Sequence, residues 1–346
     1  MTLIAGTILS QIAGWINLIG GGNYVGNVLT YIANLAKTLM GAGIGIGIAY
    51  ALGKNKLLIF SAAVAGMVGA FADKLMPGTV ALTGLNLGLP GNPIGAYVVT
   101  MLVVELVELY AGKTKLDIIL IPIGTLLLSF VGVFVAFPFI KLIDLFAMLL
   151  VITINAGAAV KIIVGVLIAV VMGVLLTMPT SSAAIWVAIA TSNTAIENPE
   201  VFAIAGGAAV AGCAAHMVGF AVASFKENGV SGLISQGIGT SMLQIPNIMK
   251  KPVIMLPEII SSAVAGLVAV LFNMRCTAAG GGMGTSGLVG LFGVIDANSS
   301  YAVEPILTVL GIVFCLFIIP AGITLLVSEF MRKKGWIKDG DMKLPD

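Results

Sequence analysis

The sequence predicts an all-α polytopic membrane protein, and its composition, the length of its apolar runs and its residue pattern each support this class. Of its 346 residues, 59% are hydrophobic and only 9% are charged, whereas soluble domains have about 45–50% apolar and about 25% charged residues. Several apolar runs reach the roughly 20 residues that a helix needs to cross the hydrocarbon of a bilayer. The alternating pattern of outer-membrane strands is absent. We therefore expect about ten transmembrane helices in one integral unit.

Apolar runs mark the expected helices, and some of them are too short to span a membrane alone. They lie near residues 2–20, 28–52, 57–72, 94–111, 116–137, 145–158, 160–178, 183–195, 201–224, 253–273 and 301–331. The first run has no charged region before it and no convincing cleavage site, so we expect it to be retained rather than removed as a signal peptide.

Basic residues beside the apolar runs indicate the orientation in the membrane. They are Lys54 and Lys56, Lys113 and Lys115, and near the C-terminus Arg332, Lys333, Lys334 and Lys338. Because basic residues that flank membrane helices stay cytoplasmic, the first two loops agree if run 57–72 exits and run 94–111 returns. Both termini are then cytoplasmic if the number of crossings is even.

Three segments between the runs, 73–93, 226–250 and 274–295, are neither lipid-like nor ordinary loops. In the first, Pro90-Gly91-Asn92-Pro93 ends any helix, because proline fixes φ and lacks a backbone donor. We expect a re-entrant or outer-face loop there, and we include Asn92 among the candidate substrate-binding residues.

The other two segments contain a repeated G-x-G-T-S turn, once at 237–241 and again 45 positions later at 282–286. Irregular backbone at membrane depth is tolerated only where protein or a water-filled cavity satisfies it, and such breaks mark the binding sites of many transporters. Two turns around helix 253–273 therefore predict paired re-entrant hairpins near 226–250 and 274–295. The alternative is that the glycines serve close helix packing, although packing does not require Thr-Ser after each glycine. The candidate binding residues are Gly239, Thr240, Ser241, Gly284, Thr285 and Ser286.

The second half of the chain contains three further candidate binding residues, His216, Asn247 and Glu258. His216 is the only histidine and lies within run 201–224; a neutral imidazole suits a hydroxyl-rich ligand because it donates and accepts, but a satisfied helix–helix contact is an equal alternative. Glu258 and Glu304 both stand at proline-marked helix starts, where the helix dipole favours a carboxylate. Glu258 is the better binding candidate because it follows Asn247 and the first turn.

The sequence argues against several classes of function. It has no Walker-type nucleotide motif, no nucleophile with an arranged base and no cluster of ligands at metal spacing. The three cysteines, Cys213, Cys276 and Cys315, lie in or beside apolar stretches and are expected to be small buried residues. We therefore expect no enzyme activity, cofactor, metal or nucleic-acid partner.

Four segments make the chain resemble the membrane subunit, enzyme IIC, of the sugar phosphotransferase system, in its stand-alone PfoR-like branch. They are PGNPIGAYV at 90–98, PTSSAAI at 179–185, the stretch from His216 to Ile248, and GGGMGTSGLVGLFG at 280–293. The resemblance implies a homodimer through an N-terminal scaffold part, here 1–158, and a transport part, here 159–331, followed by a cytoplasmic tail at 332–346. His216 and Glu258 are the positions that could fill the histidine and glutamate roles of the glucose-type branch, although its G-I-T-E signature is absent.

These observations together predict a permease of the cell membrane. It would bind a sugar or polyol and translocate it by movement of the transport part against a dimeric scaffold, while separate IIA and IIB proteins carry out any phosphorylation. The alternative is a membrane-embedded sensor or regulatory protein that keeps the permease fold.

Overall fold

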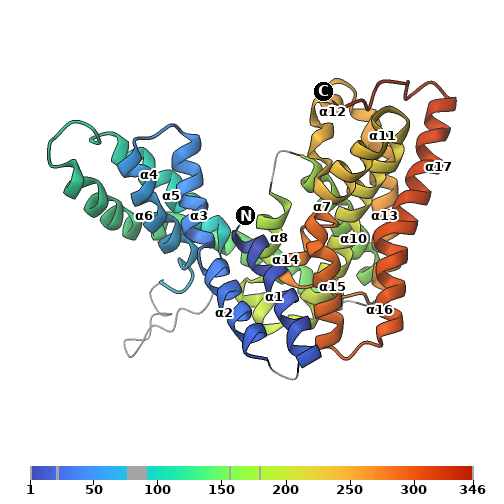
Figure 1. Cartoon of the computed structure of the whole chain (residues 1–346), viewed down its shortest axis with the longest axis horizontal. Helices are drawn as coiled ribbons and strands as arrows, with labels where there is room; N and C mark the ends of the chain where they lie inside the picture. Colours follow the sequence, from blue (N-terminus) through green and yellow to red (C-terminus); the bar gives the residue numbers. More distant parts are fainter. Residues whose placement is uncertain (1, 21–22, 76–91, 156, 179–180, 345–346) are drawn as a thin grey trace. The chain divides into compact units, whose positions relative to one another are not determined.

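The computed structural model describes residues 2–20, 23–75, 92–155, 157–178 and 181–344, and within these ranges its regular structure is entirely helical (Figure 1). The chain divides into two compact units. Unit 1 consists of Met1–Ala147 and Val187–Thr194, and unit 2 of Met148–Trp186 and Ala195–Asp346. The all-α prediction is confirmed for these ranges.

The helices have the following bounds. The first six are α1 Thr2–Gly20, α2 Tyr24–Thr38, α3 Met40–Ala51, α4 Lys56–Ala70, α5 Pro93–Glu108 and α6 Asp117–Asn155. The next are α7 Ala158–Thr177, α8 Ser182–Ala190, α9 Asn193–Glu197, α10 Pro199–Ala223, α11 Phe225–Ile234, the π-helix η1 Ser235–Gly239, the 3₁₀-helix η2 Ser241–Gln244 and α12 Ile245–Lys250. The last are the 3₁₀-helix η3 Pro252–Met255, α13 Leu256–Leu271, α14 Ala278–Gly281, the 3₁₀-helix η4 Ser286–Leu288, α15 Val289–Ser300, α16 Pro305–Ile312, the π-helix η5 Val313–Ile318 and α17 Ile319–Lys333.

Five helical segments are long and apolar enough to cross a membrane, within the described residues. They are 117–153, 159–177, 199–223, 252–271 and 305–333, and the bent pair α2 and α3 would make a sixth. About ten crossings and the two re-entrant hairpins thus remain predictions. The expected run 28–52 breaks at Leu39, where α2 and α3 meet at 43°.

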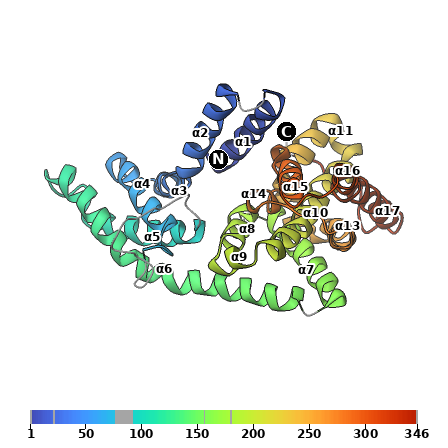
Figure 2. The same ribbon diagram turned by 90° about the horizontal axis from the view of Figure 1, so that it is seen from below.

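One expectation about the helices is wrong. Runs 116–137 and 145–158 form the single helix α6, which Figure 2 shows as continuous. Between the two expected runs, Lys141 and Asp144 pair with each other at 3.6 Å along the helix, and Pro138 lies inside it. A buried or lipid-facing helix tolerates proline when its surroundings satisfy the freed carbonyl. The segment 117–153 would be about 55 Å long at 1.5 Å per residue, well beyond the hydrocarbon thickness.

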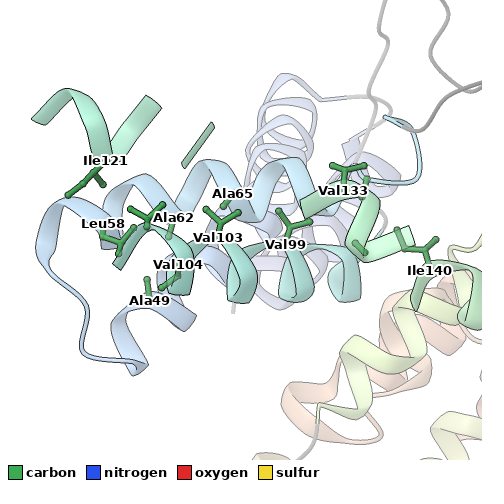
Figure 3. Close-up of a cluster of buried hydrophobic side chains, with 13 residues drawn as sticks. Ala49, Leu58, Ala62, Ala65, Val99, Val103, Val104, Ile121, Val133 and Ile140 are labelled. Carbon is green, nitrogen blue, oxygen red and sulfur yellow. The ribbon is translucent and has the colours of Figure 1, made fainter. Parts of the chain in front are cut away.

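The core of unit 1 is formed by α3, α4, α5 and part of α6 (Figure 3). Leu58 and Ala62 of α4 pack with Val99 and Val103 of α5, and all four side chains are fully buried. Lys54, just before α4, pairs with Glu105 near the end of α5 at 3.0 Å. The two predicted basic loops therefore lie at the same end of unit 1, as the orientation argument requires; that this end is cytoplasmic remains a prediction.

The core of unit 2 is built around α10, which packs against α7, α13 and α17 (Figures 1 and 2). Every residue from Phe202 to Ala221 is buried. Most of these residues are alanine or glycine, which let neighbouring helix backbones approach closely on all sides. The three cysteines are buried free thiols, as expected.

Residues 334–344, which we call the C-terminal segment, return from α17 across the end of unit 2 near α11 and α12 (Figure 1). Ile337 and Met342 are buried in a cluster with Phe220, Ile248 and Ile254. The described part of the predicted tail is therefore packed against unit 2, and the predicted cytoplasmic location of this end is untested.

Candidate functional site

The two G-x-G-T-S turns have different local structures. In the first, the chain passes from the π-helix η1 through an extended Thr240 (φ −162°, ψ 140°) into η2. The Thr240 hydroxyl accepts a hydrogen bond from the Met242 backbone N–H at 3.2 Å, so it caps η2. The second turn runs from α14 into η4, with Gly284 in the left-handed region (φ +56°).

Hydroxyls of the second turn join it to the first. Thr285 donates to the Gly237 carbonyl at 2.5 Å, and Ser286 donates to the Gly239 carbonyl at 2.9 Å. These two carbonyls belong to the π-helical turn, so side chains satisfy backbone groups of the irregular segment, as burial away from water requires. The repeat seen in the sequence therefore forms one contact in space, which we call the paired turns: residues 235–241 and 282–288.

The packing alternative also has support, at both glycines of the second turn: a Cβ on Gly282 would lie 2.6 Å from the Ser182 carbonyl oxygen. A Cβ on Gly284 would lie 2.7 Å from the backbone nitrogen of Ala214 on α10, and the positive φ disfavours any other residue. The space beside Gly239, at the matching position of the first turn, is open. The two glycines therefore differ: Gly284 is required for packing, whereas Gly239 is not.

His216 is connected to the first turn through Thr177, a residue that the sequence did not single out. The Nδ1 atom of His216 lies 2.9 Å from the hydroxyl of Thr177, at the end of α7. The same Thr177 hydroxyl lies 2.9 Å from the Ser241 hydroxyl. The other ring nitrogen, Nε2, is buried and has no hydrogen-bond partner among the described residues. The only signal for Thr177 in the sequence was a hydroxyl at the end of an apolar run.

Glu258 begins α13, as the helix-start interpretation expected, and its side chain is fully buried. It packs against α10 at Gly219, three residues after His216 and on a nearby face of that helix. Neither carboxylate oxygen has a hydrogen-bond partner within the described chain. Within the described residues, no hydrogen bond or ion pair joins Glu258 to His216, so the two side chains lie near neighbouring turns of α10 without a direct link.

Asn247 belongs to a different network. Its amide donates to Gln244 Oε1 at 2.7 Å and to the Lys343 carbonyl at 2.9 Å. Gln244 donates to Gln236 Oε1 and to the Met342 carbonyl, at 2.8 and 2.9 Å. Sequence reasoning missed the two glutamines, which connect the first turn to the C-terminal segment; their signal was two amides within a semi-polar segment that flanks the turn.

Asn92 lies in unit 1, outside the group just described. Its side chain caps α5 by accepting from the Gly95 backbone N–H at 2.8 Å. It also lines a small polar cavity with Asp73, Asp144 and Ser192 of the same unit. Residues 76–91, most of the loop predicted around it, lie outside the described residues.

The segment 179–185, which contributed to the family resemblance, is described only in part. Pro179 and Thr180 lie outside the described residues. The Ser182 hydroxyl donates to the Gly282 carbonyl at 2.7 Å, so this segment contacts the second turn.

The candidate site is enclosed by protein. The side chains of His216, Ser241, Glu258 and Thr285 are all fully buried. A ligand can reach them only after the surrounding elements move apart. Within the described residues, no group of three or more histidine, cysteine or acidic side chains could hold a metal ion.

Comparison with known proteins identifies the family. The family model described as phosphotransferase system, EIIC, matches residues 1–344 of the 346. No curated protein and no solved structure matches the chain. A match of this extent covers both units and both turns. The chain therefore belongs to the phosphotransferase system EIIC family, the membrane transport components of a system whose phosphorylation steps other proteins carry out.

Proposed function

We propose that this protein binds a sugar or polyol in unit 2 and carries it across the cell membrane. The observation that carries the proposal is the link from His216 through Thr177 to Ser241 of the paired turns, inside an enclosed unit. Buried polar groups are costly unless something completes their hydrogen bonds. The unpartnered His216 Nε2 and Glu258 oxygens supply the mixture of donor and acceptor that ligand hydroxyls need.

The candidate residues divide into two roles in this proposal. His216, Ser241 and Glu258 contact the ligand, together with the open space beside Gly239. Thr285 and Ser286 hold the paired turns closed until the ligand enters or leaves, because within the described residues their hydroxyls bond only to the opposite turn's carbonyls and to Met217. Thr240 stabilises the conformation of the first turn by capping η2, and Asn247 attaches the helix after this turn to the C-terminal segment.

The wider mechanism rests on membership in the family. Residues 159–331 act as the transport part and move against a dimeric scaffold formed by residues 1–158, and separate IIA and IIB proteins phosphorylate the sugar. The two basic loops and the C-terminal segment face the cytoplasm, where those proteins would meet the chain.

Uptake into proteoliposomes tests the proposal. The purified full-length protein is reconstituted and challenged with radiolabelled hexoses, pentoses and hexitols, with and without IIA and IIB proteins. We expect one sugar class to accumulate above empty liposomes. Binding without flux under both conditions would favour the sensor, and neither binding nor flux for any class would contradict both.

A double variant tests the site itself. Replacing Thr240 and Ser241 by alanine should weaken affinity for the transported sugar at least tenfold, because the chain to His216 is broken. Ser299→Ala with Ser300→Ala is the matched control, since both hydroxyls are exposed at the end of α15. Equal affinities in the two double variants would remove the first turn from the site.

A further inference from the structure

We propose that Glu258, with Thr324 and Gly219 around it, forms a proton-binding site within unit 2, and that opening of the unit to water releases the proton. The inference shares Glu258 with the proposed sugar site, so in that respect it deepens the proposed function. It needs no sugar to be tested.

Three helices meet at this site. A Cβ on Gly219 of α10 would lie 3.0 Å from Cγ of Glu258 on α13 and 2.8 Å from the hydroxyl oxygen of Thr324 on α17. Ser261, one turn after Glu258, donates to the Pro320 carbonyl at 3.3 Å, one turn before Thr324. The helices are therefore held together around the carboxyl group.

Protein groups do not compensate a charge on this carboxyl. Both Glu258 oxygens and the Thr324 hydroxyl are buried and without hydrogen-bond partners in the described chain. The desolvation cost of an unpaired buried carboxylate exceeds what a helix N-terminus returns, so the charged form is not stable in this enclosure.

The elements packed against α13 bring no counter-charge to Glu258. On α10 the nearest titratable group is His216, and Glu200 at the far end pairs with Arg275. On α7, Lys161 bonds to Asn273, beyond the opposite end of α13. The η5 helix carries no charged residue.

The remaining cations near these elements lie toward the C-terminal segment. Lys251, before η3, pairs with Asp341, and Arg332 of α17 pairs with Glu227 and Asp339. Glu329 of α17 pairs with Lys226, and Lys333 lies in the last turn of that helix. No ion pair within the described residues includes Glu258.

A proton fits this site better than a metal cation does. Hard cations such as Ca²⁺ and Mg²⁺ take six or more oxygen ligands, whereas the site offers the two Glu258 oxygens and one hydroxyl without other partners. Protonation converts the carboxylate to a neutral acid whose O–H is a donor, and no other reactant is needed. When the unit opens, water solvates the carboxylate and accepts the proton, so movement and protonation are coupled.

Infrared difference spectroscopy on the full-length protein in lipid nanodiscs, at neutral pH and without sugar, tests the inference. We expect a protonated-carboxyl band that shifts in D₂O, disappears in Glu258→Gln and persists in Glu304→Gln, whose carboxyl group is exposed before α16. Thr324→Val should keep the band and shift its frequency, because the adjacent hydroxyl is lost; this variant serves as the test if Glu258→Gln does not fold.

Three results would overturn the inference. They are absence of the band in the wild-type protein, its persistence in Glu258→Gln, and its loss on addition of Na⁺ at constant ionic strength, which would assign the site to sodium. Because the spectra contain no sugar, these results leave the proposed sugar transport standing. Conversely, a protein that binds no sugar could still show the band.

Discussion

At the scale of single residues, Thr177 is the connection that makes His216 part of the candidate site. The threonine hydroxyl lies 2.9 Å from both the imidazole Nδ1 and the Ser241 hydroxyl. Without it, both groups would stay buried with fewer partners, and each unsatisfied group costs about 1–3 kcal/mol. The sequence predicted His216 and Ser241 as candidate site residues but did not predict Thr177, which connects them.

Thr177→Val keeps the side chain's shape and removes its hydroxyl. We expect the affinity for the transported sugar to fall roughly tenfold, because His216 and Ser241 lose their common partner. Equilibrium binding to the purified protein measures the change. Thr153→Val is the control, since the Thr153 hydroxyl bonds only to carbonyls of its own helix; a similar loss in both variants would contradict a specific role for Thr177.

Gly284 and Gly239, at matching positions of the two turns, should respond differently to alanine. Gly284→Ala should lower the free energy of unfolding by about 2 kcal/mol or more, because it combines a strained left-handed backbone with overpacking against α10. Gly239→Ala meets open space and should change thermal stability little. Thermal unfolding in detergent compares the two, and an equal effect would refute the assignment of Gly284 to packing.

At the scale of elements, the C-terminal segment is held to α11 chiefly by one carboxylate. Glu227 accepts hydrogen bonds from the Arg332 guanidinium and from the backbone N–H groups of Gly340 and Met342, at 2.9–3.2 Å. The Asn228 side chain donates a hydrogen bond to the Met342 carbonyl and accepts one from the Leu344 backbone N–H. This arrangement fixes the segment against the network that leads to the first turn.

Glu227→Gln should release the C-terminal segment. The amide keeps the size of the carboxyl group but loses the charge that pairs with the partly buried Arg332, which weakens the contact that holds the segment. We expect faster amide hydrogen exchange at residues 336–344. Glu329→Gln, which removes a more exposed pair with Lys226, should leave this exchange unchanged; protection retained in Glu227→Gln would show that other contacts hold the segment.

Acid should loosen the same segment through Asp341. Partial burial raises the pKa of this carboxyl, but hydrogen bonds from Lys251 and from the Lys338 backbone N–H outweigh burial and lower it below the ordinary value of 3.8. Because the pKa of Asp341 is lower in the folded protein than in the unfolded chain, its contact contributes its full stability when the pH is above the pKa of the unfolded chain. This stability is lost as the pH falls through the pKa of the folded protein. Hydrogen-exchange protection at 338–344, relative to the intrinsic rate at each pH, should therefore stay high at neutral pH and fall only below about pH 4; Asp341→Asn should abolish this dependence.

At the scale of the whole molecule, a closed unit 2 must open for the proposed transport. Ser241→Cys should react slowly with a water-soluble thiol reagent, because Ser241 is fully buried. Adding Thr285→Val and Ser286→Ala, which removes both bonds between the turns, should accelerate labelling about tenfold or more. Ser299→Cys, at an exposed position, should label quickly in both backgrounds. Equal labelling of Cys at 241 with and without the two bonds would show that they do not keep the unit closed.

The sequence by itself determined the class, the family resemblance and the location of the candidate site. Composition alone required a membrane protein, because a chain with so few charged residues has too little polar surface to face water. The repeated turn, His216 and Glu258 were visible because polar and glycine-rich residues are conspicuous in apolar runs. The sequence failed between runs 116–137 and 145–158, where it predicted two helices: Lys141 and Asp144 pair with each other within the single helix α6.

The tertiary structure decided which of these residues act together. Pairing of the two turns, the Thr177 connection and the meeting of Gly219, Glu258 and Thr324 all join residues far apart in the chain, and spacing along a sequence contains no such distances. It also showed that the Asn92 amide caps α5 and that the Asn247 amide bonds to Gln244 and the C-terminal segment, although a sugar would use the same amides. The sequence also left open whether each glycine serves close packing or a binding site. Only the contacts with α10 show that Gly284 is needed for packing, while Gly239 borders open space.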